Sequence, residues 1–394
     1  MKHFFCVAII FLLSASYVQA ADVPYIELRG EAGSIGNVRF SPDGKKVMTI
    51  DWFAICDEDN RTTRFDYGFD SRFGSKTVQV WDIDSGKELQ RLEHTGGIHS
   101  ARFFPDGKKI VTAGREDRTI RIWDAESGEE LRQWEVPATI FYAIPSPDGR
   151  KIVTVSMDTT TRIWDAESGE ELHTLEGQVA TGNGAISPDG TKIVTTSGEG
   201  GTIRIWDAES GKELHAMEGH TRSMSIWTAI FTPDGKKVAT GSGDRTARIW
   251  DAESGEELHT LEGHGSWVWF VAFSPDESRI VTSGADGSTR IWDALSGRAL
   301  HELEGLILPN YCPAPFSLDG TKIVTTGRPH QRAALVYDIE SGRELLKLTG
   351  HTGSVRLATF SPDGRKIVTV SGEDGTVRIW DVESLFRPPI ITDF

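Results

Sequence analysis

The sequence predicts an all-β protein made of eight copies of one antiparallel, four-stranded unit. Two observations indicate this fold class. An aromatic-Asp pair recurs eight times at steps of 41 to 45 residues, and most copies contain short apolar runs separated by turns of proline, aspartate and glycine. A fixed period of this length is typical of a unit that buries its apolar faces against its neighbours. The pairs are Trp81-Asp82, Trp123-Asp124, Trp164-Asp165, Trp206-Asp207, Trp250-Asp251, Trp292-Asp293, Tyr337-Asp338 and Trp380-Asp381.

Residues 257–293 show how one repeat divides into strands. Leu258 and Leu261 belong to a short outer strand, and residues 267–273 form an apolar run, rich in aromatic and β-branched residues, that is typical of a buried strand. Pro275 and Asp276 favour a tight turn, because proline fixes φ at the first central turn position. Two further strands are expected at residues 279–282 and 288–292, so each repeat supplies four strands.

This arrangement resembles the WD-repeat family of β-propellers, whose four-stranded blades are set radially around a channel. The resemblance covers residues 21–384 and implies an eight-bladed propeller as one domain. Residues 25–30, YIELRG, match the outer-strand ending LHTLEG at residues 258–263, whereas two prolines after Asp381 disfavour a regular strand there. We therefore expect the N-terminal strand to complete the last blade and to close the ring.

The first twenty residues are typical of a secretory signal peptide. Lys2 and His3 precede an apolar run from residue 4 to about residue 13, and we expect cleavage after Ala20. An uncleaved membrane anchor is the alternative, but the run is shorter than the roughly 20 residues that a bilayer span needs. We expect a secreted or periplasmic protein with no membrane span after removal of residues 1–20. The role of the C-terminal tail, residues 385–394, stays open.

The formal net charge of −16 argues against nucleic acid as a partner, because an acidic surface repels phosphate backbones. Removing residues 1–20 would take away one lysine and one of the three cysteines, which leaves a charge of −17. The two remaining cysteines are too few to form the framework of the fold.

Four repeats carry a histidine, a threonine, an aspartate and a tryptophan at matching spacings. Such a set resembles a catalytic relay, but an enzyme needs one asymmetric site, whereas four copies indicate a hydrogen-bond chain within each blade. The family resemblance implies a structural tetrad in which Asp and Thr hold His, and His reaches toward the indole. We expect no catalytic residues. The sets are His94, Thr112, Asp117 and Trp123; His220, Thr240, Asp244 and Trp250; His264, Thr282, Asp286 and Trp292; His351, Thr369, Asp374 and Trp380.

The other four repeats depart from the tetrad, so blades one, three, four and seven should be less rigidly held. The departing residues are Glu31, Ser75, Val136, Gln178, Gly200, Leu306, Gln331 and Tyr337. Six arginines stand two residues before a tryptophan, on the same strand face. We expect their stems to pack between blades and their heads to meet carboxylates, rather than to form a phosphate-binding stripe. They are Arg121, Arg162, Arg204, Arg248, Arg290 and Arg378.

The repeats differ most at the start of each inner strand. In propellers of this family, the residue seven before each hairpin Asp lines the channel mouth on the face that bears the tetrad His and Asp. These residues are Gly36, His99, Phe141, Gly182, Trp227, Trp269, Cys312 and Arg356, with Tyr142, Trp267, Asn310 and Tyr311 nearby. Aromatics and arginine are typical of interaction hot spots. The partner-binding residues we predict are His99, Phe141, Tyr142, Trp227, Trp269, Tyr311 and Arg356. Alternatively some of these side chains pack between blades, and Trp267 is the one most expected to do so.

The first repeat carries an insertion at about residues 51–75 on the same face. A long excursion in a regular repeat is either a binding loop or tolerated decoration. A cluster of oxygen ligands in the insertion, Asp57, Glu58, Asp59 and Asn60, could bind calcium, but the spacing does not fit an EF-hand, and we predict no metal site. Cys56 in the insertion and Cys312 at the channel mouth are both expected near this face, so a disulfide between them is an open possibility.

These patterns favour an exported, non-catalytic scaffold that binds a protein or peptide on its tetrad-bearing face, as a monomer or as part of a hetero-complex, without a cofactor. A lectin-like propeller is the alternative, with Trp227, Trp269 and Tyr311 as stacking platforms and Asn310 and Arg356 as hydrogen-bonding groups. A periplasmic propeller enzyme is less favoured, because the sequence shows no unpaired nucleophile-base set. The fold itself does not name the partner.

Overall fold

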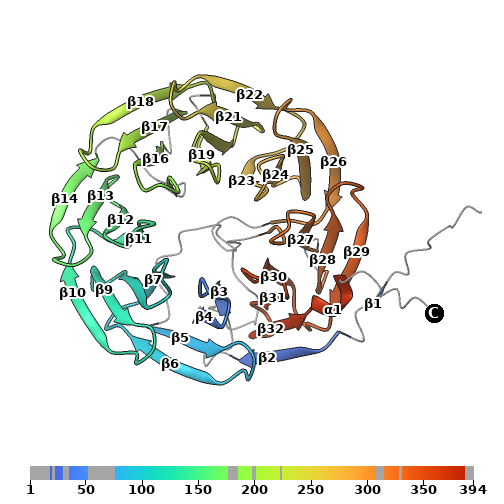
Figure 1. The fold of residues 1–394 in the computed structure, drawn as a ribbon, viewed down its shortest axis with the longest axis horizontal. Helices are drawn as coiled ribbons and strands as arrows, with labels where there is room; N and C mark the ends of the chain where they lie inside the picture. Colours follow the sequence, from blue (N-terminus) through green and yellow to red (C-terminus); the bar gives the residue numbers. More distant parts are fainter. Residues whose placement is uncertain are drawn as a thin grey trace, which may run out of the picture.

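The computed structural model describes residues 18–19, 23–29, 35–51, 76–175, 185–197, 201–221, 224–307, 315–327 and 331–386. It confirms the predicted fold class, since the strands form eight four-stranded sheets arranged as a ring around a central channel (Figure 1). Among the described residues the one helix is α1 (Glu383–Phe386), and no helix there is long and apolar enough to span a bilayer.

Blades one to four follow one another along the chain, each running from the channel outward. Blade one contains β3 (Ile35–Phe40), β4 (Lys46–Asp51), β5 (Thr77–Asp82) and β6 (Glu88–Glu93). Blade two contains β7 (Ile98–Phe103), β8 (Lys109–Gly114), β9 (Thr119–Asp124) and β10 (Glu130–Glu135). Blade three contains β11 (Ile140–Pro145), β12 (Lys151–Ser156), β13 (Thr161–Asp165) and β14 (Glu171–Leu175). Blade four contains β15 (Ala185–Ile186), β16 (Lys192–Thr196), β17 (Thr202–Asp207) and β18 (Glu213–Glu218).

Blades five to eight complete the ring. Blade five contains β19 (Ile226–Phe231), β20 (Lys237–Ser242), β21 (Ala247–Asp251) and β22 (Glu257–Leu261). Blade six contains β23 (Val268–Phe273), β24 (Arg279–Gly284), β25 (Ser288–Asp293) and β26 (Ala299–Glu304). Blade seven contains β27 (Lys322–Thr326), β28 (Ala333–Asp338) and β29 (Glu344–Thr349), with an isolated bridge from Phe316 to Ile323 at the inner position. Blade eight contains β30 (Val355–Phe360), β31 (Lys366–Ser371) and β32 (Thr376–Asp381).

The predicted closure of the ring is confirmed. Strand β2 (Tyr25–Arg29) pairs antiparallel with β32 and supplies the outer strand of blade eight. Arg378 of β32 contacts Glu27 of β2 at 3.1 Å, and Leu28 is 2% exposed. The two ends of the chain therefore share one sheet, which removes an open edge from the ring. A second short strand, β1 (Val18–Gln19), pairs in parallel with β29, and it lies within the predicted signal peptide.

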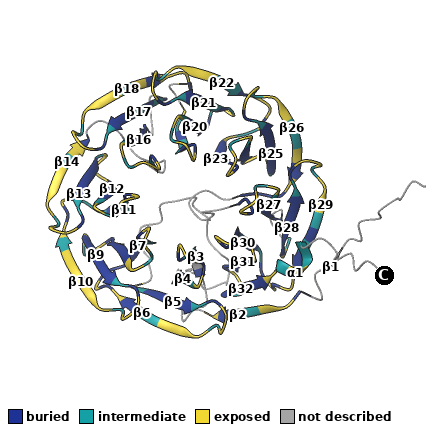
Figure 2. Cartoon of the chain, in the orientation of Figure 1, coloured by how far each residue is buried: buried dark blue, intermediate teal, exposed yellow. Residues whose placement is uncertain are grey.

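The core lies between neighbouring blades. One cluster joins Val194 and Ile205 of blade four to Ile226, Val238 and Trp250 of blade five. The middle strands are buried on both faces, which explains their continuous Ile, Val and Thr runs. Outer strands alternate toward solvent and appear as the exposed rim of the ring (Figure 2).

The Pro-Asp-Gly turns lie on the face opposite the tetrads. In the first of them, Ser41 Oγ donates a hydrogen bond of 2.6 Å to Asp43 Oδ1, and the Lys46 amide donates one of 2.9 Å to Ser41 Oγ. Gly44 closes this turn at a φ of 70°. In blade six a non-glycine residue, Glu277, takes this position at a φ of 60°. The short turn explains why each inner strand returns directly along its own blade.

Candidate partner-binding face

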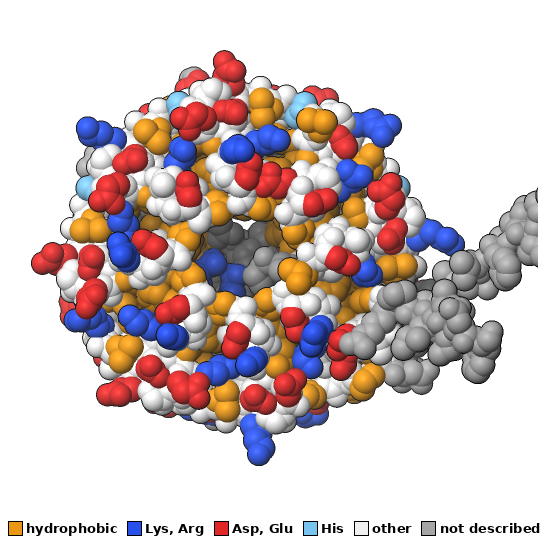
Figure 3. All heavy atoms as spheres, in the orientation of Figure 1, with side chains coloured by type: hydrophobic (Ala, Val, Ile, Leu, Met, Phe, Trp, Pro, Cys, Tyr) orange, Lys and Arg blue, Asp and Glu red, His pale blue; other side chains and the backbone are white. Residues whose placement is uncertain are grey.

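The tetrad histidines and aspartates all lie on one face of the ring. Each histidine follows the outer strand of one blade and each aspartate lies between the second and third strands of the next blade, so both connections meet at one rim. We call this rim the tetrad-bearing face and the rim of the Pro-Asp-Gly turns the opposite face. The opposite face carries interspersed acidic and basic side chains, as seen around the ring in Figure 3.

The structure brings the four residues of every predicted tetrad together. In blade five, Asp244 Oδ2 lies 2.9 Å from His220 Nδ1, and His220 Nε2 lies 2.8 Å from Thr240 Oγ1. Trp250 Nε1 donates to the same hydroxyl at 2.9 Å. The His-Asp, His-Thr and Trp-Thr distances are 3.2, 2.6 and 2.8 Å in blade two, 2.9, 2.7 and 2.8 Å in blade six, and 3.0, 2.8 and 2.8 Å in blade eight.

Within the tetrad the histidine reaches toward the indole through the threonine hydroxyl. The threonine lies between them, so Thr240 bridges His220 and Trp250. An indole N–H can only donate, so the threonine hydroxyl accepts a hydrogen bond from it. The same hydroxyl then donates a hydrogen bond to His220 Nε2. His220 Nδ1 then carries the proton and donates to Asp244. The chain of donors runs in one direction from the blade interior to the surface.

Burial and hydrogen bonding fix the charge states of the histidines in blades two, six and eight. Burial lowers the pKa of His94 to about 4 and also lowers the pKa values of His264 and His351. Burial alone would raise the pKa of Asp374. The hydrogen bonds from Thr376 and His351, together with the positive charge that His351 carries once it is protonated at acidic pH, outweigh burial and lower that pKa to about 2. At neutral pH these three histidines are uncharged and Asp374 is ionised.

Three blades without the histidine keep part of the network. The indoles of Trp81, Trp164 and Trp206 donate to Thr49, Thr154 and Thr195 at 3.0, 2.8 and 2.9 Å. In blade seven the Tyr337 hydroxyl donates to the Glu304 carbonyl at 3.0 Å instead. The sequence carries a signal for the three Trp-Thr pairs, since each threonine stands at the tetrad spacing. Without the histidine, however, the pattern consists of one threonine and one tryptophan. Such a short pattern is hard to recognise in strands that are rich in both residues.

The six arginines before the tryptophans contact carboxylates, as the sequence suggested. The partners and distances are Glu130 at 2.9 Å for Arg121, Asp158 at 2.7 Å for Arg162, Glu213 at 2.9 Å for Arg204, Glu302 at 2.8 Å for Arg290 and Glu27 at 3.1 Å for Arg378, while Arg248 pairs with Glu257. Arg162 pairs with the aspartate whose counterparts in the tetrads hold a histidine, and blade three has Val136 at the histidine position.

The predicted channel-mouth residues coincide with a β-bulge that begins the inner strands. In β7 the pairing register skips from Ile98 to Ser100, and in β19 it skips from Ile226 to Thr228. His99 and Trp227 are the residues that the register passes over. A bulge leaves one residue unpaired and redirects its side chain. The same skip occurs at Gly36, Phe141, Trp269 and Arg356.

Several of the predicted partner-binding residues are half-buried. His99 stacks on Phe141 with 6.0 Å between ring centroids, and His99 Nδ1 donates to the Ile140 carbonyl at 3.0 Å. Burial lowers the pKa of His99, so this ring is neutral at pH 7. Arg356 lies beside Gly372 at the start of the turn between β31 and β32. Tyr311, Cys56, Cys312, the insertion from residue 52 onward and the tail from residue 387 lie outside the described residues.

Two tryptophan predictions are corrected by the structure. Trp267 does not pack between blades but is 49% exposed, because it precedes the bulge of β23. Trp269 is 8% exposed and belongs to an apolar cluster with Leu306 and Phe316, so side chains before and within blade seven cover it. Trp267, rather than Trp269, therefore presents its ring to solvent on this face.

Trp267 borders a groove between blades five and six. Its ring stacks on Trp227 with 5.8 Å between centroids, and the groove has a volume of about 330 Å³. Met224, 40% exposed, and Arg245 line the groove with Asp244 and Gly243. Arg245 adopts a φ of 73°, which strains a residue that bears a side chain. Met224 and Arg245 were not predicted as site residues, since neither belongs to a repeated position that stands out in sequence.

The described residues contain no group of three or more His, Cys, Asp or Glu side chains placed to hold a metal ion. The groove itself presents two stacked indoles, a flexible thioether and an exposed guanidinium. Aromatic rings and arginine are the side chains that most often dominate binding energy at protein interfaces.

Comparisons with known proteins agree with this architecture. The family model described as "WD domain, G-beta repeat" matches residues 86–124, 134–165, 169–207, 211–251, 255–293 and 342–381, which is more than half of the chain. The crystal structure of the computationally designed Ika8 protein is similar in fold, with a TM-score of 0.70 and 24% identity, over 90% of this chain and 98% of that one.

Curated relatives match shorter parts of the chain. Periodic tryptophan protein 2 of Saccharomyces cerevisiae is 44% identical over 52 residues, which is 13% of this chain and 6% of that protein. Target of rapamycin complex subunit wat1 of Schizosaccharomyces pombe is 37% identical over 70 residues, or 17% and 21%. WD repeat and SOCS box-containing protein 1 of Homo sapiens is 42% identical over 48 residues, or 12% and 11%. The chain thus matches a minor part of each relative's length. From the family model and the eight-bladed ring together, the chain belongs to the WD-repeat family.

Proposed function

We propose that this protein is an exported, non-catalytic scaffold that binds a protein or peptide partner on its tetrad-bearing face, in the groove between blades five and six. The observation that carries the proposal is the solvent-exposed Trp267 ring stacked on Trp227 beside Met224 and Arg245. An exposed apolar cluster rimmed by polar residues is typical of a protein interaction site. Methionine adapts its shape to a partner, and tryptophan provides a large rigid contact.

The non-catalytic part of the proposal is supported by the burial of the tetrads. The side chains of His94, His220, His264 and His351 are 0 to 1% exposed. Each histidine uses both ring nitrogens within its own tetrad, so no substrate could reach one without breaking the network. One similar protein is named as a subunit of a complex, the target of rapamycin complex, which agrees with a scaffold role for this chain.

Affinity capture tests the proposed face. The wild-type protein and a Trp267→Ala variant are used as bait in an extract of the source cells, with Leu295→Ala as the matched control. Leu295 is an equally apolar residue, 82% exposed, in the turn between β25 and β26 on the opposite face. We expect a specific partner to be lost with Trp267→Ala and kept with Leu295→Ala. Equal recovery with both variants, at equal melting temperatures, would exclude the groove as the binding site.

A carbohydrate ligand is the second candidate, and the stacked indoles favour it as well. An exposed tryptophan ring beside a carboxylate and a guanidinium offers both a stacking surface and hydrogen bonds for a sugar. Trp267 takes the platform role that the sequence assigned to Trp269. A glycan array separates the two functions, since a scaffold gives no specific signal, whereas a lectin binds defined glycans and loses them with Trp267→Ala.

Export is proposed from the apolar N-terminal run. N-terminal sequencing of the mature protein isolated from its native cells tests it. We expect the mature chain to begin at Ala21, and a chain that begins at Met1 would contradict export by a cleaved signal. Cleavage after Ala20 would keep β2 intact and would remove the pairing between β1 and β29.

A further inference from the structure

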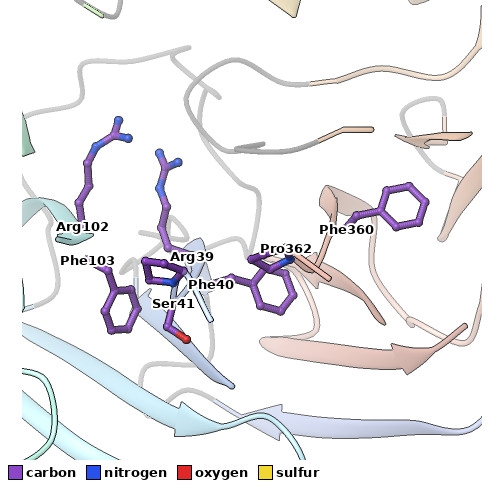
Figure 4. Close-up of a pocket in the computed structure, with 8 residues that line it drawn as sticks. Arg39, Phe40, Ser41, Arg102, Phe103, Phe360 and Pro362 are labelled. Atoms are coloured by element: carbon purple, nitrogen blue, oxygen red, sulfur yellow. The ribbon is translucent and has the colours of Figure 1, made fainter. Parts of the chain in front are cut away.

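The central channel contains a basic site that the proposed binding groove does not use. Arg39 of β3 and Arg102 of β7 lie on adjacent blades, and their side chains extend side by side in the same direction, while Phe40 and Phe103 point to the other side of their strands (Figure 4). The channel opening on the opposite face shows basic side chains within it (Figure 3). A cavity of about 200 Å³ at this end is lined by both arginines with Phe40, Phe103 and Phe360.

Strand register places these arginines in one layer of the channel wall. In the six blades with a described inner strand of full length, the residues that share this register are Arg39, Arg102, Ile144, Ile230, Ala272 and Thr359. The next layer toward the tetrad-bearing face contains Asn37, Ser100, Tyr142, Thr228, Phe270 and Leu357. These two layers hold two positive charges and no carboxylate, in a chain whose formal net charge is −16.

Arg102 differs from the arginines between the blades. All six of those arginines have a carboxylate partner, whereas Arg102 has no ion pair among the described residues. The buried Nε of Arg102 also has no hydrogen-bond acceptor among them, as is true of the Nε of several arginines between the blades. Burial lowers the pKa of the Arg102 guanidinium, although arginine stays charged at neutral pH. Leaving a buried charged donor unpaired is costly, so an anion in the channel would restore favourable contacts.

Tyr142 and Asn37 add neutral polar groups to the two guanidiniums. Burial raises the pKa of Tyr142 to about 12 even though Arg102 and Arg39 act to lower it, so its hydroxyl stays protonated and can donate a hydrogen bond. The Asn37 side-chain oxygen is buried without a hydrogen-bond partner among the described residues. Two cationic forks and a hydroxyl donor on three adjacent blades match the oxygens of a carboxylate. In blade three, next to Arg102, the same layer continues as Ile144, which suits an apolar group attached to the carboxylate.

We infer that the channel, entered from the opposite face, binds an organic carboxylate that carries an apolar group. The carboxylate contacts Arg102, Arg39 and Tyr142, and the apolar group lies against the aliphatic part of the wall. Two sources supply this chemistry: the C-terminal residue of a peptide and a free carboxylic acid. The site is separate from the Trp267 groove, so the test of carboxylate binding does not depend on whether the proposed partner-binding face is correct.

Isothermal titration of the full mature protein tests the inference with four probes: an acetylated Ala-Leu-Ile peptide with a free C-terminus, the same peptide amidated, 3-phenylpropionate, and inorganic phosphate. We expect one site per ring, at least tenfold weaker binding of the amide than of the free acid, and affinity that falls as salt rises. Tight binding of the peptide acid alone identifies a peptide terminus as the source, whereas tight binding of phenylpropionate identifies a free acid. Phosphate that binds as tightly as the carboxylates would overturn the assignment.

Substitutions distinguish a direct loss of carboxylate binding from a general effect of the substitution on the fold. Arg102→Gln should weaken carboxylate binding at least tenfold, and Arg102→Lys should weaken it less, because it keeps the charge and loses the fork. Arg365→Gln is the control, since Arg365 is an exposed arginine that follows a Pro-Asp-Gly turn on the same face. Trp267→Ala should leave carboxylate binding unchanged. Binding that survives Arg102→Gln and Arg39→Gln, or that fails with every acid in the wild-type protein, would refute the channel site.

Discussion

The hydroxyl of Thr240 accepts a hydrogen bond of 2.9 Å from Trp250 Nε1 and lies 2.8 Å from His220 Nε2, so one threonine joins the core tryptophan of blade five to the histidine at its rim. Trp250 is 1% exposed and packs against blade four. The tetrad therefore connects the apolar contact between two blades to the loop that begins the next inner strand. Its four copies hold the tetrad-bearing face in place.

Thr240→Val tests this connection. Valine keeps the shape but removes the hydroxyl, which leaves both His220 Nε2 and Trp250 Nε1 buried without a partner. We expect a loss of about 1–3 kcal/mol for each group left unpaired, measured as a lower melting temperature. Thr195→Val is the matched control, because among the described residues the Thr195 hydroxyl bonds only the indole of Trp206. An equal loss in both variants would show that the histidine adds nothing to stability.

Stability should fall as the pH falls below about 6.5. The pKa of His94 is lowered to about 4 by burial, and those of His264 and His351 are lowered too. The unfolded histidines bind protons first as the pH falls, so this stabilisation is complete above the ordinary histidine pKa and is lost toward pH 4. The lowered pKa values of Asp117, Asp286 and Asp374 add a further loss below about pH 4.

Melting temperatures at pH 7.5, 6 and 5 measure this effect, with His94→Gln as the comparison. The chain itself has a glutamine, Gln178, at this position of repeat four. The variant should be less stable at pH 7.5 but should lose less stability between pH 7.5 and pH 5. Parallel curves for the two proteins would contradict the assignment of a neutral, buried His94.

Arg245→Gly should raise stability and weaken partner binding. Arg245 adopts a φ of 73°, and blades six and eight have Gly287 and Gly375 at this position. Relief of the strain should stabilise the fold by about 1 kcal/mol. Arg118→Gly is the matched control, with a φ of 51° in blade two and no place in the groove. We expect both variants to melt higher and only Arg245→Gly to bind the captured partner more weakly.

Leu28→Ala tests the closure of the ring by β2. Leu28 is 2% exposed in the outer strand of blade eight, and its match is Leu261, 1% exposed in the outer strand of blade five. Both substitutions should cost about 2–5 kcal/mol. Only Leu28→Ala should speed hydrogen exchange in β31 and β32, since those strands pair with a segment from the other end of the chain. Faster exchange confined to β21 and β22 in both variants would argue against this closure.

The blade number, the closure and the tetrad members could be predicted because each depends on local pattern repeated many times. Eight aromatic-Asp pairs fix the period, and the match of YIELRG to an outer strand fixes which end closes the ring. The exposure of Trp267 and the burial of Trp269 could not be predicted, because a bulge between Val268 and Phe270 decides which side chains turn outward. A one-residue change of register exchanges the two faces of a strand.

The basic layer of the channel was also missed from sequence. Arg39 and Arg102 are 63 positions apart in the numbering, and the stacking of blades one and two around the channel places their side chains next to each other. In the sequence each is a single arginine before a phenylalanine at the end of an apolar run. The groove residues Met224 and Arg245 were missed for a similar reason, since they come from two connections that meet only in the folded blade.

Recognition on the tetrad-bearing face is best tested by hydrogen exchange measured on the protein alone and in complex with its captured partner. We predict slower exchange on binding at residues 224–227, 243–246 and 265–268, around the Trp267 groove, with no change at the Pro-Asp-Gly turns of the opposite face. Protection confined to those turns, or to the outer strands, would contradict recognition on the tetrad-bearing face.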